Sequence, residues 1–122
     1  MNKMTQPITP QLENSTNTGN RYNVGKAKFS LIPPLGLKEI ANVATMGAEK
    51  YDDWNWLKGL PVTTYLDSMQ RHIHAFSIGQ TNDEESGYPH MAHAAWNAMA
   101  IIDTMAVHPK LDDRPTYYKN II

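Results

Sequence analysis

Two stretches with helical periodicity, separated by a short acidic loop, constrain this chain more than any other feature. Both lie between Tyr65 and Met105. In the first, apolar residues recur at the spacing that places them on one helix face: Leu66, Met69, Ile73 and Phe76. In the second, the apolar face contains Met91, Ala95, Ala98, Met99 and Ile102. The two stretches therefore predict a pair of amphipathic helices.

Polar residues in these stretches follow the same helical period. His90, His93 and Asn97 share one face of the second helix, because the later two lie three and seven positions after the first. His72 lies beside the apolar stripe of the first helix, so we expect it to be at least half buried. Polar groups should therefore converge at one end of the pair.

The loop between the two helices carries termination signals and a run of carboxylates. Gly79 is predicted to end the first helix and Ser86 to cap the second, whose first turn tolerates Pro89. Residues 83–85, Asp-Glu-Glu, would then lie near a helix N-terminus, where carboxylates are stabilised and metal or phosphate sites often form. Such a run is also common in solvated turns, so both interpretations stay open.

A third helix is predicted from Leu35 to about Lys50. Its apolar positions repeat at helical spacing and are Leu37, Ile40, Ala41, Ala44 and Ala48. Strand signals are weak, because no sustained alternation and no hairpin dipeptide occurs. The predicted class is all-α, with three main helices per subunit. Three helices make a thin core, so we expect an oligomeric helical bundle, a dimer or a tetramer.

The chain divides into three predicted parts. Residues 1–24 are polar and rich in Asn, Thr and Pro, which predicts a mobile N-terminal arm. Residues 25–107 form the all-α domain. Residues 108–122 form a C-terminal tail that packs on the surface or on a partner subunit.

Composition excludes several classes of protein. The formal net charge of the 122-residue chain is -1, so no general basic surface exists for a nucleic-acid polymer. The chain has no cysteine, which excludes disulfides, thiolate metal sites and a cysteine nucleophile. Apolar runs are too short for a membrane span, and no signal peptide is visible. We expect a soluble, cytoplasmic protein.

Two further segments allow either a structural or a functional interpretation. Lys26 and Lys28 precede a short apolar run, which either packs on the core or places the lysines beside a phosphate. Trp54 and Trp56 either cover the hydrophobic core or, together with Asn55, stack on a base and form hydrogen bonds with its edge.

Known catalytic motifs narrow the chemistry further. The chain has no glycine-rich phosphate loop, no GxSxG elbow, no HExxH helix and no His-Asp dipeptide. His90 and His93, three positions apart on a helix, correspond to half of a metal site, but such pairs are also common as hydrogen-bonded core residues.

Three segments together resemble a known family: GKAKFSLIPP, GAEKYDDWNWLKG and RHIHAFSIGQTNDEESGYPHMAHAAWNAM. They are similar to the dATP/dGTP diphosphohydrolases of bacteriophages, which are related to the MazG-like, all-α nucleoside triphosphate pyrophosphohydrolases. The resemblance extends from Gly25 to Met105. It implies an oligomeric enzyme that cleaves a purine deoxynucleoside triphosphate to the monophosphate and pyrophosphate, with Mg²⁺ or Mn²⁺ as cofactor.

The resemblance also implies roles for individual residues. Metal ligands would be Glu49, Asp83 and Glu85. Catalytic residues would be His72, Glu85 and His90. Substrate would be bound by Lys26, Lys50, Asn55, Trp56, Arg71, His93 and Asn97.

The sequence departs from the family pattern at several positions. Related enzymes carry an ExxE…ExxD set, of which only residues 49–52, Glu-Lys-Tyr-Asp, are present as a fragment. Gln80 stands where glutamate is common, and Leu35 and Gly36 follow the double proline where an acidic and a small residue are common. These departures favour an alternative, a non-catalytic protein that binds or sequesters a nucleotide signal. The intact DxESGxxH pattern favours the hydrolase.

Overall fold

The computed structural model describes residues 18–121, which form two compact units, one ending at Ile32 and the other beginning at Pro33. Three α-helices, all in the second unit, dominate the fold: α2 (Pro34–Lys50), α3 (Val62–Ser77) and α4 (His90–Val107). Three short 3-10 helices accompany them: η1 (Phe29–Leu31), η2 (Asn55–Lys58) and η3 (Pro109–Leu111). Within residues 18–121, the only β feature is an isolated bridge between Asn82 and Pro89. The prediction of an all-α fold with three main helices is confirmed.

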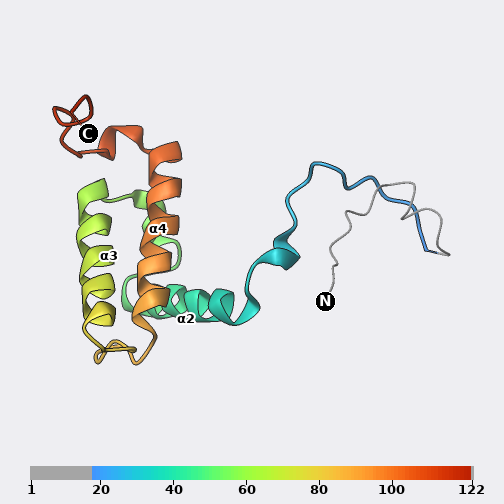
Figure 1. Ribbon diagram of the computed structural model, residues 1–122, viewed down its shortest axis with the longest axis horizontal. Coiled ribbons are helices and arrows are strands. Elements are labelled where there is room, and N and C mark those ends of the chain that lie inside the picture. The colour runs from blue at the N-terminus through green and yellow to red at the C-terminus, as the bar shows by residue number, and fades with distance from the viewer. Residues whose placement is uncertain (1–17, 122) are drawn as a thin grey trace. The chain divides into compact units, whose positions relative to one another are not determined.

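Helices α3 and α4 run side by side in opposite directions, and α2 lies crosswise against α4 (Figure 1). The extensive packing between α3 and α4 makes this pair the centre of the unit. None of the described helices is long and apolar enough to cross a membrane. The predicted mobile arm falls largely on residues 1–17, which lie outside the described part of the chain.

Helix α4 buries its polar face. His90, His93 and Asn97 are only 3%, 8% and 6% exposed, whereas Met99 and Ile102 are 49% and 68% exposed. Helix α3 likewise buries Val62 and Tyr65, while Ile73 and Phe76 of the expected apolar stripe are 45% and 46% exposed. The sequence located both helices, but the apolar faces it identified remain largely open in a single chain.

The loop between α3 and α4 begins as predicted but joins α4 differently from the prediction. Gly79, with a φ of 108°, follows the end of α3 as expected, and the Gln80 N–H donates to the Ala75 carbonyl at 3.0 Å. Ser86, however, does not cap α4: that helix begins at His90 with Pro89 at the N-cap position and no side-chain cap. The prediction was wrong because the loop makes a further turn between residues 83 and 89 before the helix begins.

The C-terminal tail packs back on the start of α3 and on the loop before it. Asp113 accepts hydrogen bonds from the backbone N–H of Thr63 at 2.9 Å and from its hydroxyl at 2.6 Å, so it caps α3 from outside the helix. His108 Nε2 donates to the Leu57 carbonyl at 2.7 Å. Gly59, with a φ of 76°, faces these residues so closely that a Cβ would lie 2.7 Å from a Leu111 methyl carbon. Residues 108–113 of the tail therefore pack on the second unit.

We expect Asp113→Asn to lower the melting temperature at neutral pH by a few degrees. The two Thr63 hydrogen bonds hold the pKa of the Asp113 carboxyl below its ordinary value of 3.8. A depressed carboxyl pKa stabilises the folded state above pH 3.8, and this stabilisation is lost as the pH falls through the folded-state pKa. The difference in melting temperature between the wild type and the variant should therefore become smaller in acid. Thermal melts across pH test this, with Asp103→Asn on exposed α4 surface as the control; a pH-independent difference would contradict it.

Candidate functional site

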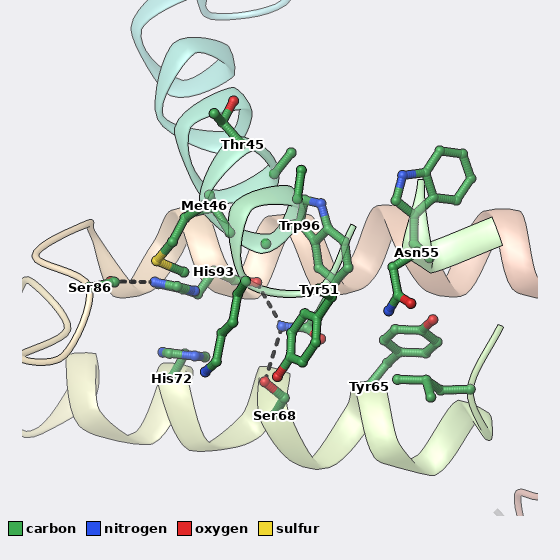
Figure 2. Close-up of a pocket in the computed structure, with 18 of the residues that line it drawn as sticks. Thr45, Met46, Tyr51, Asn55, Tyr65, Ser68, His72, Ser86, His93 and Trp96 are labelled. Carbon is green, nitrogen blue, oxygen red and sulfur yellow. Dashed lines mark hydrogen bonds between the residues drawn. The ribbon is translucent and has the colours of Figure 1, made fainter. Parts of the chain in front are cut away.

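A pocket of about 1010 Å³ opens between the C-terminal half of α2, the loop that follows it, and the α3–α4 pair. Figure 2 shows His72 and His93 at one end of this pocket, Asn55 and Tyr65 at the other, and Tyr51 between them. The volume lies at the upper end of the range for small-molecule sites. The pocket is therefore large enough for a ligand of nucleotide size.

The end near Asn55 is aromatic. Trp54 adopts a left-handed backbone with φ 57°, which turns the chain into η2 and brings Asn55 and Trp56 to the pocket wall. From the helices, Tyr65 and Trp96 face each other with ring centroids 6.3 Å apart. The Tyr65 hydroxyl is buried and has no hydrogen-bond partner among the described residues. This end thus combines flat aromatic surfaces with an amide and an unpaired hydroxyl.

The opposite end holds three histidines in contact. The His72 and His93 rings stack at 4.4 Å with 7° between their planes, and the His90 ring lies 5.1 Å from that of His72. Each ring has a polar partner: His93 Nε2 lies 2.7 Å from the Ser86 hydroxyl, His90 Nε2 lies 2.6 Å from Gln80 Oε1, and His72 Nδ1 lies 2.8 Å from His90 Nδ1. The rings are therefore held in fixed orientations, although two come from α4 and one from α3.

Asn97 extends this buried polar face one turn along α4. Its amide donates to the His93 carbonyl at 2.9 Å and to the Ser68 hydroxyl at 3.2 Å. Figure 2 shows this hydrogen bond to Ser68, which ties α4 to α3 beside Tyr51. The Asn97 side chain therefore links α3 and α4 in the wall of the pocket.

Asp83 is oriented by its own loop. Its Oδ2 accepts the Ser86 N–H at 2.8 Å, and its backbone N–H donates to the Tyr88 carbonyl at 2.8 Å. Partial burial opposes ionisation of this carboxyl, but the hydrogen bonds from Ser86 and the nearby His93 and His72 together lower its pKa below the ordinary value. Asp83 therefore presents a negative charge to the histidines.

His72, Asp83 and His90 form a possible metal-binding group. Each offers one ligand atom, and the three atoms lie within 4.8 Å of one another. Two imidazole nitrogens and a carboxylate oxygen are a donor set that divalent transition metals accept. This set shares only Asp83 with the metal ligands predicted from the sequence. Glu49 is exposed and does not line the pocket, whereas Glu85 does line it.

Charged side chains in the pocket wall are mostly acidic. Two cations, Lys50 and Arg71, line the pocket. Four carboxylates line it as well: Asp52, Asp53, Asp83 and Glu85. Neither cation is paired with a carboxylate within residues 18–121. A divalent cation would reduce the repulsion between these carboxylates and an anionic ligand.

Most of the residues predicted as a site share this pocket. Its wall contains Lys50, Asn55, Trp56, Arg71, His72, Asp83, Glu85, His93 and Asn97. His90 lies behind His72 and does not line the pocket. Lys26 belongs to the first unit and Glu49 points elsewhere.

Sequence reasoning missed several residues that line the pocket. Ser68, Tyr51, Tyr65 and Trp96 lie in its wall, and Ser86 binds His93 there. Helical spacing could have found Ser68, because it lies four residues before His72 on the same helix face. No comparable signal identifies Tyr51, whose place depends on the irregular chain after α2.

We expect the metal-free protein to lose stability as the pH falls below about 6.5. Burial, then the neighbouring His93, lowers the pKa of His72; burial also lowers the pKa of His93. The unfolded chain therefore takes up protons first, and the free energy of unfolding decreases from that pH down to the folded-state pKa values.

Urea unfolding across this range in the presence of a chelator measures the effect. His72→Gln and His93→Gln should each flatten the pH dependence, while His74→Gln on the exposed side of α3 should leave it unchanged. A profile that is the same in all four proteins would show that other groups cause the dependence.

Comparison with known proteins places the chain. A model of the family described as dATP/dGTP diphosphohydrolase, N-terminal, matches residues 16–114. A protein of Salmonella phage PMBT28, named dATP/dGTP diphosphohydrolase, is 38% identical over 97 residues. That alignment covers 80% of this chain but 33% of the relative, so the chain spans about a third of the relative's length. No solved structure gives a significant match. The chain belongs to the dATP/dGTP diphosphohydrolase family, in the region that the family model describes as N-terminal.

Proposed function

We propose that this chain hydrolyses purine deoxynucleoside triphosphates, dATP and dGTP, to the monophosphate and pyrophosphate, using a divalent cation, Mg²⁺ or Mn²⁺. The observation that carries the proposal is the two-ended pocket, in which an aromatic, amide-bearing end faces an end of histidines. Carboxylates and cations also line this pocket. The family match and the name of the phage relative support the substrate class.

The aromatic end is the proposed base site. Trp56 and Tyr51 offer flat surfaces for stacking, and the Asn55 amide can donate to and accept from a purine edge. The buried Tyr65 hydroxyl, which lacks a partner in the described chain, adds a further polar group beside Asn55. Asn97, which lines the pocket and donates to Ser68, would contact the sugar.

The histidine end is the proposed triphosphate site. Lys50 and Arg71 line the pocket and would contact phosphate oxygens. Metal ions would neutralise phosphate charge and lower the pKa of an attacking water. Because carboxylates outnumber cations among the lining residues, we infer that the triphosphate enters as its metal complex.

The reaction adds one water across one bond. The water oxygen attacks the α-phosphorus, the bond from that phosphorus to the bridging oxygen of the β-phosphate breaks, and pyrophosphate leaves. Glu85 would accept the proton of the water, His72 would orient the water or a phosphate oxygen, and His93, held by Ser86, would contact the phosphate. His90 would not touch the substrate, because it contacts the His72 ring and does not line the pocket.

We expect Glu85→Gln to reduce kcat at least about 100-fold with little change in melting temperature, because the exposed side chain keeps its size but loses its charge. The assay incubates the chain with each deoxynucleoside and ribonucleoside triphosphate plus Mg²⁺ or Mn²⁺ and separates the products by chromatography. Glu84→Gln is the matched control, because Glu84 is the adjacent exposed carboxylate and does not line the pocket. Equal rates for the two variants would remove Glu85 from the site. Nucleotide binding without turnover in wild type would instead favour the non-catalytic binding protein.

We also propose that the chain forms a homo-oligomer, a dimer or a tetramer. The support is the outward apolar face of α4, where Met99 and Ile102 are exposed, together with the exposed Ile73 and Phe76 on α3. Large apolar side chains gathered on outer helix faces are a common basis of association between subunits. An enzyme of this kind would act on the nucleotide pool of the host cytoplasm.

The oligomer proposal predicts that Ile102→Glu converts the assembly to monomers, because a charge at a buried interface costs more than the contacts provide. Size-exclusion chromatography with light scattering gives the mass of each species. Leu35→Glu, at an exposed leucine on α2, should leave the mass of the assembly unchanged. A wild-type mass of 13.8 kDa, that of a single chain, would contradict the proposal.

A further inference from the structure

The cluster of His72, Asp83 and His90 does not have the composition expected of a magnesium site. Its ligand atoms lie within 4.8 Å of one another, and two of the three are imidazole nitrogens. Mg²⁺ prefers hard oxygen ligands and keeps several waters, whereas imidazole suits transition-metal ions, Zn²⁺, Cu²⁺, Fe²⁺ and Ni²⁺ most and Mn²⁺ least. Two nitrogen ligands out of three therefore favour a transition-metal ion over Mg²⁺ at this cluster.

The hydrogen bond to Gln80 fixes which nitrogen of His90 is free. Gln80 Oε1 can only accept, so His90 Nε2, 2.6 Å away, carries the hydrogen. In the neutral ring, His90 Nδ1 then holds a lone pair, and this atom lies 2.8 Å from His72 Nδ1. Two ligands at right angles around an ion with bonds of about 2.1 Å are about 3 Å apart. The two nitrogens are therefore spaced almost as neighbouring ligands of one ion.

Asp83 supplies the third ligand and the only charge among the three donors. Its Oδ2 is bound by the Ser86 N–H, and no hydrogen bond occupies Oδ1 in the part of the chain described here. A hydrogen bond between the two histidines would pair their rings without any carboxylate. It gives no account of why a negative group, fixed by its own loop, approaches both of them.

We propose that His72, Asp83 and His90 bind one transition-metal ion through two imidazole nitrogens and one carboxylate oxygen, and that this site prefers Mn²⁺ over Mg²⁺. His72 and Asp83 also line the pocket, so the remaining positions of the ion would face it. Gln80 is a positioning residue that holds the His90 ring in the ligating orientation. The ion would serve the proposed hydrolysis, so its role rests on that function, but its binding does not.

Titration calorimetry on the full chain, stripped of metal with a chelator, tests the preference directly. The expected result is one Mn²⁺ per chain, bound at least about tenfold more tightly than Mg²⁺, since nitrogen ligands penalise the harder ion. Equal affinities for the two ions, or no Mn²⁺ binding at all, would overturn the proposal.

Variants locate the ion. His72→Gln and Asp83→Asn should each weaken Mn²⁺ binding at least about tenfold, because each removes one ligand. Both residues are only partly buried, so these variants are expected to fold, which circular dichroism checks. The matched control is His74→Gln, an exposed histidine on the same helix, which should bind Mn²⁺ as wild type does. Wild-type affinity in both ligand variants would contradict the assignment.

Gln80 gives a test that a merely structural role would not pass. Gln80→Glu should raise the Mn²⁺ affinity, because a carboxylate that accepts from His90 Nε2 makes the other nitrogen a stronger ligand. Gln80→Leu should lower the affinity about tenfold, since the ring loses its orienting partner. Equal losses in both variants would contradict the assigned role of Gln80.

The binding and activity measurements separate the two proposals. Tight Mn²⁺ binding without cleavage of dATP or dGTP would overturn the proposed function and leave the metal site standing. Cleavage that proceeds equally well with Mg²⁺ and is unaffected by His72→Gln would overturn the metal site and leave the function standing.

Discussion

The burial of a polar helix face is the constraint on which the rest of this structure depends. His90, His93 and Asn97 occupy the side of α4 that packs inward, where an unpaired polar group would cost more than its packing contributes. Each is therefore matched: Gln80 binds His90, Ser86 binds His93, and Ser68 binds Asn97. The partners come from α3 and from the loop, so satisfying these groups also fixes how the two helices meet.

The loop between α3 and α4 provides the second half of that arrangement. Gly79 and Gly87 both adopt positive φ values, of 108° and 77°, which lets the chain reverse twice within a few residues. Asp83 then binds the Ser86 N–H, and the Ser86 hydroxyl both reaches His93 and accepts the Tyr88 N–H at 3.1 Å. One short segment thus supplies a carboxylate to the pocket and a partner to a buried ring.

Helical periodicity predicted the three helices but not which faces are buried. The usual rule places Met99 and Ile102 inside and histidines outside, and a single chain does the reverse. The rule does not describe the single chain because it ranks residues by hydrophobicity, whereas hydrogen bonds from residues distant in sequence decide whether a histidine can be buried. Spacing along one helix indicated that His90 and His93 act together, but the meeting of His90 with Gln80 depends on the loop conformation. Trp56 was named only as a residue that could stack on a base, and Tyr51 was not identified, because the chain after α2 that positions them follows no helical period.

The hydrogen bonds between Asp113 and Thr63 affect how the start of α3 unfolds locally. Thr63 N–H is one of the amides that a helix leaves without an internal partner, and here it is satisfied from fifty residues away by Asp113. Its exchange with solvent deuterium therefore reports on whether the tail is attached, not on whether α3 is unwound. Since Gly59 leaves no room for a side chain beneath Leu111 and His108, crowding at that position would speed deuterium uptake at Thr63 while the middle of α3 stayed protected. The first turn of α3 and the part of the tail around Asp113 would then open as one unit.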